Sequence, residues 1–276
     1  MSISVLILTL NEELNLPDCL ESVSWSDDIV VFDSFSADRT VEIAKAAGAR
    51  VVQRKFDNWS AHQNWAVENI EFKYPWVYYS DADEIMTSEL RDEILKVTSE
   101  KDRPEVAYRV RFKNMFMNRW IKRSSLYPTW VLRLFRPECV RWERLVNPVP
   151  IINGKEGKLQ SHFEHYTFNK GMTEWINKHN LYSQNEASEL IKTINRCINW
   201  KGLLSRDPAV RRKSLKELAF HMPFRPFLVF FYLYFFRFGF LDGIPGLTYC
   251  RLRSMYEYMI DLKVKELRRK EKGLAV

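Results

Sequence analysis

The chain has 276 residues, of which 46% are hydrophobic and 14% aromatic. This is enough apolar material for the core of one large α/β domain, alone or with an appendage, and it excludes an intrinsically disordered chain. Charge is unevenly spread: residues 201–276 hold 16 Lys/Arg and 7 Asp/Glu, a net charge of +9, which leaves 26 and 28, or −2, for residues 1–200. The basic character therefore belongs to the C-terminal quarter.

The cysteines, the glycines and the first residues of the chain argue against several common classes of protein and segment. The four cysteines lie far apart without a C-x-x-C spacing, which favours reduced thiols in a cytosolic compartment over disulfides or a zinc site. The nine glycines form neither G-x-G-x-x-G nor a P-loop, which argues against a dinucleotide enzyme or an ATPase. The start, "MSISVLILTLNEE", lacks a basic region before its short apolar run, so we expect a buried strand there rather than a signal peptide.

The first hundred residues alternate between strand-like and helix-like segments, as βαβ units do. Near-continuous Val, Ile and Leu in the strand-like segments predict a parallel sheet covered on both faces by helices. We expect strands at 2–10, 28–34, 50–54 and 76–80, and helices at 16–23, 38–49, 60–70 and 88–98.

The middle of the chain has a different pattern. Residues 106–116 and 129–137 alternate with period two, as strands of a mixed or antiparallel region do. The stretch between them, "MNRWIKRSSLYPT", is a basic and aromatic loop. Residues 172–200 return to a helical pattern, so we expect a mixed sheet followed by a helix.

Polar residues follow three of the predicted parallel strands, at the edge of the sheet where ligands bind. The three clusters are Thr9/Asn11/Glu12, Asp33/Ser34/Ser36/Asp38 and Asp81/Asp83/Glu84. Asp81 and Asp83 are one residue apart, and such close carboxylates repel unless a cation neutralises them. Their oxygens suit Mg²⁺ or Mn²⁺, which would also bridge a ligand's phosphates. A solvated turn is the alternative, but three polar strand ends on one edge favour a metal and diphosphate site.

Three stretches of the first hundred residues resemble the signatures of family 2 glycosyltransferases of the GT-A fold. They are "SVLILTLNEELNLPDCLESV", "DIVVFDSFSADRTVEIAKAAGARV" and "WVYYSDADEIMTSEL". The likeness continues more loosely through "GKLQSHFEHYTFNKGMTEWINKHNLYSQNEA" and "FRFGFLDGIPGLTYCRLRSMYEYMIDLK". These two stretches are similar to the bacterial branch that builds lipopolysaccharide core and exopolysaccharide repeat units.

This resemblance implies a mixed α/β sheet of GT-A (Rossmann-like) type flanked by helices, and an inverting transfer from a nucleotide sugar, with a UDP-sugar as the expected donor. Asp81 and Asp83 match the D-x-D motif that binds the nucleotide and a divalent metal, Mg²⁺ or Mn²⁺, and Asp83 is the expected catalytic carboxylate. The residues that match the nucleotide pocket are Thr9, Asn11, Glu12 and Asp33. The implied reaction is a direct displacement at the anomeric carbon.

The catalytic base departs from the family pattern. Many relatives have "VHE" after the middle strands, whereas this chain has "LVNPV" (145–149), with Asn147 and Pro148 in place of His and Glu. Neither residue can accept a proton. Glu143 is a candidate base, and a surface carboxylate paired with Arg141 or Arg144 is the alternative for it. An acceptor that is already ionised, such as a lipid phosphate, would need no base.

Basic residues further along the chain are candidates for anionic groups of the substrates. His162 and His165 form H-x-x-H without a third ligand at zinc spacing, so we expect one of them to contact substrate and the other to be structural. Lys178 and His179 match a helical segment of the family at which a cation near the diphosphate would be sensible, and a solvated helix face is the alternative. Arg123, in the basic loop, could reach an anionic acceptor; no nucleic-acid recognition fold accompanies it.

The C-terminal region contains "PFLVFFYLYFF" (226–236), eleven residues without a charge. As a helix it would span roughly 16 Å, about half of a bilayer core, so a normal transmembrane segment is excluded. Aromatic residues on all faces and basic flanks favour a helix lying in a membrane interface through residues 223–240, and a core helix is the alternative.

We therefore expect a catalytic domain at 1–200 for nucleotide sugar and acceptor, and a basic, aromatic, membrane-associating helical region at 201–276. The expected protein is an inverting glycosyltransferase at the cytoplasmic face of the bacterial inner membrane. It would transfer a sugar to a lipid-linked glycan or lipopolysaccharide core, and no nucleic-acid partner is expected. Two alternatives stay open: a polyprenyl-phosphate glycosyltransferase, and a catalytically silent GT-A domain that acts as a membrane scaffold or partner subunit.

Overall fold

The computed structural model describes residues 2–100, 102–143, 148–194, 200–205 and 224–275, together with a few residues between 207 and 222. The chain forms two compact units. The first unit is Met1–Trp120 with Tyr127–Lys170, and the second is Ile121–Leu126 with Gly171–Val276. The expected division at residue 200, between a catalytic domain and a membrane-associating region, is a division by function and stays a prediction. The compact units part at Lys170, which groups the following helix with the C-terminal region.

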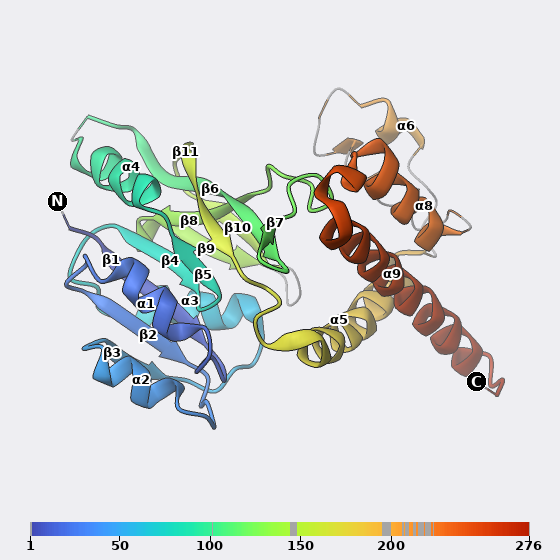
Figure 1. The fold of residues 1–276 in the computed structure, drawn as a ribbon, viewed down its shortest axis with the longest axis horizontal. Coiled ribbons are helices and arrows are strands. Elements are labelled where there is room, and N and C mark those ends of the chain that lie inside the picture. The colour runs from blue at the N-terminus through green and yellow to red at the C-terminus, as the bar shows by residue number, and fades with distance from the viewer. Residues whose placement is uncertain are drawn as a thin grey trace. The chain divides into compact units, whose positions relative to one another are not determined.

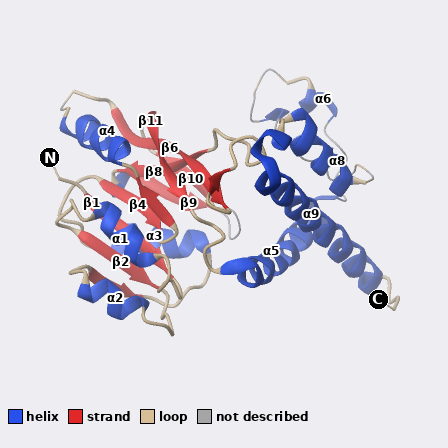
Figure 2. Ribbon diagram, in the orientation of Figure 1, coloured by secondary structure: helices blue, strands red, loops and turns tan. Residues whose placement is uncertain are grey.

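A mixed sheet forms the centre of the first unit (Figure 2). The strands of this unit are β1 (Ser4–Thr9), β2 (Ile29–Asp33), β3 (Arg50–Gln53), β4 (Val77–Asp81), β5 (Glu84–Met86), β6 (Glu105–Phe116), β7 (Arg119–Trp120), β8 (Trp130–Phe135), β9 (Val140–Glu143), β10 (Val149–Ile152) and β11 (Lys155–His165). The order across the sheet is β3-β2-β1-β4-β8-β6-β11-β5, with β7 paired to β6 and β9 paired to β10 in a small second sheet.

The direction of the strands matches the two sequence patterns. β3, β2, β1 and β4 run parallel to one another, as the βαβ alternation predicts. β8 is antiparallel to both β4 and β6, and β11 is parallel to β6. The expected fold class, a mixed α/β sheet flanked by helices with a C-terminal helical extension, is confirmed.

Helices cover both faces of this sheet (Figure 1). They are α1 (Leu16–Val23), α2 (Thr40–Ala46), α3 (Trp59–Asn69) and α4 (Ser88–Ser99), with a short 3-10 turn η1 at Pro137–Cys139. Side chains of β1 alternate between two apolar cores: Val5 and Ile7 pack with α1, α2 and α4, whereas Leu6 and Leu8 pack with α3 and β9. Burial on both sides explains why residues 5–8 of this strand are all apolar.

The acidic stretch after β4 is a turn followed by a strand. Ala82 and Asp83 form the turn, and Glu84 begins β5, which pairs antiparallel with β11. The sequence pattern does not predict β5, because three residues carry too little periodicity. The helix after it begins where expected, with Thr87 as its N-cap; the Thr87 hydroxyl accepts a hydrogen bond from the backbone N–H of Leu90.

The second unit is helical. Its elements are α5 (Gly171–Ile194), α6 (Trp200–Leu203), α8 (Arg225–Phe231), the π-helical turn η2 (Tyr232–Phe236), the 3-10 turn η3 (Gly239–Asp242) and α9 (Gly243–Glu271). Ala187 and Leu190 of α5 pack against Tyr256 and Ile260 of α9. The expected aromatic helix at 226–236 corresponds to α8 and η2. Residues 195–199 of the helical stretch expected at 172–200 lie outside the described residues.

Among the described residues, no single helix is both long and apolar enough to cross a bilayer. By length and composition alone, Arg225–Phe236 and Gly239–Glu271 would reach that threshold together, as a pair of helices bent by 72°.

Candidate active site

The carboxyl ends of three parallel strands meet at one edge of the sheet in the first unit. Thr9 at the end of β1 is in register with Asp33 at the end of β2, and Leu8 is in register with Asp81 at the end of β4. The three polar clusters recognised in the sequence are therefore neighbours, as a ligand site at this edge requires.

Asp33 connects the polar clusters that follow β1 and β2 through hydrogen bonds. Its carboxylate is fully buried and accepts hydrogen bonds from Thr9 Oγ1 at 3.0 Å, from Gln53 Nε2 at 2.8 Å, and from both the backbone N–H and the hydroxyl of Ser36. A buried carboxylate is stable in a folded protein only when it is paired or hydrogen-bonded in this way. In this structure Asp33 therefore shapes the loop that follows β2, and its expected role toward the nucleobase or ribose stays a prediction.

The loop after β1 is tied to the same structure. The backbone N–H of Asn11 donates to Ser36 Oγ at 2.8 Å, and the Asn11 side-chain oxygen accepts from the backbone N–H of Ala37 at 2.8 Å. Asn11 itself has a left-handed backbone, with φ of 55°, a conformation that Asn tolerates better than most residues. Hydrogen bonds thus join the loop after β1 to the loop after β2.

Glu12, in the loop after β1, forms an ion pair with Lys170. Lys170, at the end of the first unit, donates to Glu12 Oε1 at 2.5 Å, and Asn15 Nδ2 donates to Oε2 at 2.8 Å. Burial raises the pKa of Glu12 despite these hydrogen bonds, and the negative charge of Asp83 raises it further. Lys170 therefore supplies the local positive charge that lets Glu12 lie close to the acidic turn.

Arg133 of β8 pairs with the first aspartate of the motif. Its Nη2 lies 2.6 Å from Asp81 Oδ2 and also donates to Glu84 Oε1. The guanidinium lies between the rings of Tyr79 and Phe163, with its carbon 4.9 and 5.5 Å from their centroids. The exposed fraction of the side chain is 36% for Asp81 but 1% for Glu84, so Asp81 alone of this pair of carboxylates is open to a ligand.

His165 of β11 pairs with the second aspartate. Its Nε2 lies 3.4 Å from Asp83 Oδ2, and the backbone N–H of Tyr166 donates to the Asp83 carbonyl at 2.8 Å. Burial alone would lower the pKa of His165, but the negative charge of Asp83, followed by that of Glu84 and Asp81, raises it overall. Each aspartate of the D-x-D stretch thus has a basic side chain from a distant strand as its neighbour.

The family pattern described as glycosyl transferase family 2 matches residues 4–154, more than half of the chain. The chain belongs to glycosyl transferase family 2. The matched residues contain the whole edge described above except His165 and Lys170.

The chain is also similar to several named proteins. An uncharacterized glycosyltransferase of Rickettsia typhi is 28% identical over 213 residues, which cover 72% of this chain and 71% of that protein. The lipopolysaccharide core biosynthesis glycosyltransferase LpsC of Rhizobium meliloti is 26% identical over 205 residues, 70% of this chain and 73% of LpsC. Among solved structures, the mannosyltransferase PcManGT of Pyrobaculum calidifontis, in complex with GDP-Man and Mn²⁺, has a TM-score of 0.49 and 14% identity over 96% of this chain and 87% of that one.

Not every expected site residue lies at this edge of the glycosyltransferase. Glu143 is exposed at the end of β9, and Arg141, considered as its partner, pairs instead with Glu68 at 3.2 Å. Asn147, at the position where relatives carry a candidate base, lies outside the described residues, and Pro148 follows it. The role of Glu143 as a base stays a prediction.

Three of the expected basic residues belong to the second compact unit and not to the first. Arg123 lies in the segment 121–126, and Lys178 and His179 lie on α5. His179 stacks on Trp175 at 3.7 Å and its Nδ1 lies 2.8 Å from the Trp175 carbonyl; burial lowers its pKa to about 4. These contacts give His179 a packing role within the unit, and contact with substrate stays a prediction for all three.

Two residues of the site were missed by the sequence patterns. Arg133 is the one charged residue in the strand "WVLRLF", and a charge inside an apolar strand signals a buried partner. Lys170 follows "HYTFN" with no regular pattern around it, and nothing local marks it. Arg133 could have been found from this signal, whereas Lys170 could not.

The donor set at the turn fits a divalent metal that arrives with a diphosphate. Asp81 and Asp83 offer two partly exposed carboxylates, and Mg²⁺ is commonly held by one or two carboxylates together with substrate phosphates. Within the described part of the chain, no group of three or more His, Cys, Asp or Glu side chains could hold a metal by itself. The phosphates would have to complete the coordination.

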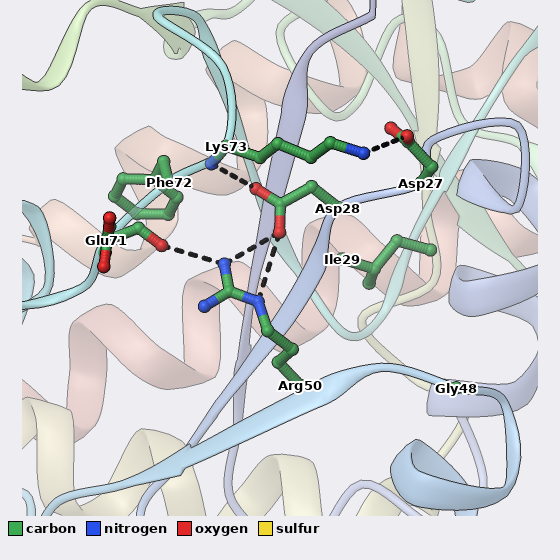
Figure 3. Close-up of a pocket in the computed structure, with 8 residues that line it drawn as sticks. All are labelled: Asp27, Asp28, Ile29, Gly48, Arg50, Glu71, Phe72 and Lys73. Atoms are coloured by element: carbon green, nitrogen blue, oxygen red, sulfur yellow. Dashed lines mark hydrogen bonds and ion pairs between the residues drawn. The ribbon is translucent and has the colours of Figure 1, made fainter.

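A hollow of about 400 Å³ lies at the opposite ends of the strands (Figure 3). Its charged groups are already paired: Arg50 bonds Asp28 at 2.7 Å, Lys73 pairs with Asp27, and the Lys73 backbone N–H donates to Asp28 at 2.8 Å. These contacts connect the segments that precede or begin β2, β3 and β4. The hollow is separate from the site at the carboxyl ends of these strands.

Proposed function

We propose that this glycosyltransferase transfers a sugar from a nucleotide-sugar donor, with a UDP-sugar as the first choice, by an inverting mechanism that requires Mg²⁺ or Mn²⁺. One observation carries the proposal: Asp81 ends β4 and Asp83 lies on the turn that follows, both partly exposed at the ligand-binding edge of the sheet and backed by Arg133 and His165. Family membership supplies the reaction class.

The residues of the edge have separate tasks in this proposal. Asp81 and Asp83 would hold the metal and the donor diphosphate, and a bound metal supplies charge neutralisation for the departing nucleoside diphosphate. Thr9, Asn11 and Asp33 hold the two loops of the nucleotide pocket in a fixed shape, which reduces the reorganisation that binding would otherwise cost.

The acceptor determines whether the proposed reaction needs a catalytic base. Glu143 is exposed on β9 next to Trp142, which packs on Tyr79, two residues before Asp81. It is the candidate base for an acceptor with a free hydroxyl. A polyprenyl phosphate acceptor, ionised beforehand, would need no base, and the Pro148 found where relatives have a glutamate favours this second candidate function.

We further propose that the acceptor is a lipid-linked glycan or a lipopolysaccharide core and that the enzyme works at the cytoplasmic face of the bacterial inner membrane. The similarity to LpsC supports this acceptor class. The basic C-terminal quarter, with its net charge of +9, supports a location at an anionic surface.

The decisive experiment is a thermal-shift screen of UDP-, GDP-, dTDP- and CMP-sugars with Mn²⁺, followed by transfer assays with the donor that stabilises most. We expect Asp83→Ala to lower transfer by about a hundredfold or more, because it removes charge stabilisation of the leaving group. Asp92→Ala is the matched control, since Asp92 is a carboxylate on the surface of α4 that pairs with Arg91.

Two results would refute the proposal. Full transfer by Asp83→Ala without any metal would exclude the D-x-D site as the donor site. Nucleotide binding by the wild-type protein with no turnover on lipid phosphate, lipid-linked glycan or lipopolysaccharide core would instead favour the silent scaffold.

A further inference from the structure

The second unit carries an unusually apolar outer face between residues 224 and 244. Phe224, Phe236 and Ile244 are the most exposed of these, at 76, 76 and 75%. The exposed large apolar residues of this stretch are Phe224, Phe227, Leu228, Phe231, Tyr232, Phe235, Phe236, Phe238, Phe240, Leu241 and Ile244. We call this set the aromatic face.

The spacing of the aromatic face shows that it is one continuous surface. From Phe224 to Phe236 its members recur every three or four residues, which places them along one side of the helical turns α8 and η2. The opposite side is apolar as well, with Leu233 only 4% exposed. A helix at a water-exposed surface normally carries polar side chains outward, so an apolar outer side marks an interaction surface.

Close backbone packing fixes the turn between η2 and α9, which carries part of this face. A Cβ added at Gly239 would lie 2.6 Å from the Leu233 carbonyl oxygen, and one added at Gly246 would lie 2.4 Å from the Gly239 oxygen. Only glycine permits these approaches. Backbone packing therefore fixes the turn η3, on which Phe240 and Leu241 are exposed; Phe238, also exposed, precedes it.

The exposed charges around the aromatic face are positive, because its acidic neighbours are buried. Glu257 is 6% exposed and pairs with Arg225 of α8. Asp242 is the single acidic residue between 222 and 256, and it is 7% exposed. Its Oδ2 accepts from the backbone N–H groups of Arg123 and Ser124 at 2.9 and 2.8 Å, and from Ser124 Oγ at 2.7 Å. These bonds hold the loop 121–126 against η3. The side chains of Lys122 and Arg123 in this loop are exposed.

We propose that the aromatic face and the loop 121–126 together form a surface that docks onto an anionic phospholipid bilayer, with the aromatic side chains in the interface and Arg123 at the headgroups. This inference rests on the membrane location in the proposed function and names the surface responsible. The one-sided charge decides for this occupant: a lipid interface takes apolar side chains and cations together, with about 1 kcal/mol for each basic residue near the surface.

The loop 121–126 gives the surface a covalent connection to the first unit, because it leaves β7 and returns to β8. Docking of the second unit would therefore restrain a segment between two strands of the glycosyltransferase sheet. The hydrogen bonds between Asp242 and Ser124 lie within the second unit.

Vesicle flotation of the full chain, without donor, acceptor or metal, tests the docking surface. We expect binding to vesicles that contain phosphatidylglycerol and weaker binding to pure phosphatidylcholine. The double substitution Phe236→Ser/Ile244→Ser should weaken binding about tenfold or more, because it removes two side chains that the interface buries. Arg123→Gln should weaken it about fivefold on the anionic vesicles only. Leu181→Ser, at a 61% exposed position of α5, is the matched control and should bind as wild type.

Three outcomes would overturn the docking proposal: equal flotation of the double variant and wild type, no binding of wild type to either vesicle, or a wild-type dimer in solution that the double substitution dissociates, which would show that a second copy covers the face. Asp83→Ala separates this proposal from the enzymatic one. It should float as wild type whether or not it transfers sugar.

Discussion

Arg133 and Glu84 form a buried ion pair beneath the D-x-D turn. Glu84 is 1% exposed and receives a hydrogen bond from the guanidinium, while its second oxygen accepts from the backbone N–H of Asp81 at 3.3 Å. Burial raises the pKa of Glu84 to about 7, even though Arg133 opposes this change. The turn that presents Asp81 is thus held from below by a carboxylate, and that carboxylate depends on a cation from β8.

Removing the cation should therefore destabilise the fold. We expect Arg133→Met to lower the free energy of unfolding by about 3 kcal/mol or more, because Glu84 would be left buried without its partner. The double variant Arg133→Met/Glu84→Met should recover most of this loss, since an apolar pair has no desolvation cost. Urea denaturation at neutral pH measures both.

Arg136→Met provides the control for the loss of an arginine beside an aromatic ring. Arg136 lies over Trp76, 5.0 Å from the ring centroid, and its substitution should cost about 1 kcal/mol or less. Equal unfolding free energies for the single and double variants at Arg133 would show that the pair with Glu84 does not stabilise the turn.

Much of the first unit could be predicted from the sequence because its signals are local. The strands β1–β4 and the helices α1–α4 follow from apolar runs and helical periodicity within single segments, and their observed bounds differ from the expected ones by only a few residues. Thr9, Asp33 and Asp81 could be placed at one edge because parallel strands in βαβ units share a direction.

The rest depends on contacts between distant segments. His165 reaches Asp83 through the pairing of β11 with β5, across about eighty residues of chain, and β5 itself is too short for a pattern to reveal. The same applies to the loop 121–126. Its sequence identifies it as basic and aromatic, but only the buried Asp242 shows which unit it belongs to.

A buried histidine in the first unit predicts loss of stability in mild acid. His62 stacks on Phe32 at 4.1 Å, its Nδ1 lies 3.1 Å from Arg54 Nη1, and its Nε2 lies 3.3 Å from Ser34 Oγ. Because the guanidinium can only donate, Nδ1 must accept and the ring is neutral, with its proton on Nε2. Burial, followed by the charge of Arg54, lowers the pKa of His62 to about 4, and Asp57 opposes this change.

The sign follows from linkage. The unfolded chain binds a proton at His62 below pH 6.5, whereas the folded chain does so only near pH 4, so stability is unaffected above pH 6.5 and falls as the pH drops through this window. At pH 5 the loss should be about 2 kcal/mol. His62→Gln removes the titrating ring, so urea denaturation of this variant between pH 7.5 and 5 should show a shallower loss. An identical pH slope for the variant and wild type would exclude His62 as the source.

The bond between Asp242 and Ser124 should govern the order of the loop 121–126. Asp242→Ala removes the acceptor of two backbone N–H groups and one hydroxyl, and Ser124 is fully buried. An unsatisfied buried donor costs about 1–3 kcal/mol, so the loop should open far more often than in wild type. Hydrogen exchange followed by mass spectrometry should show the Ser124 amide losing about tenfold or more of its protection, while the amides of β1 stay protected. Asp242→Asn is the matched control, because its side-chain oxygen can still accept these bonds, and it should keep most of the protection. Unchanged exchange at Ser124 in Asp242→Ala would mean that other contacts hold the loop, and Asp242 would then have no part in presenting Arg123 beside the aromatic face.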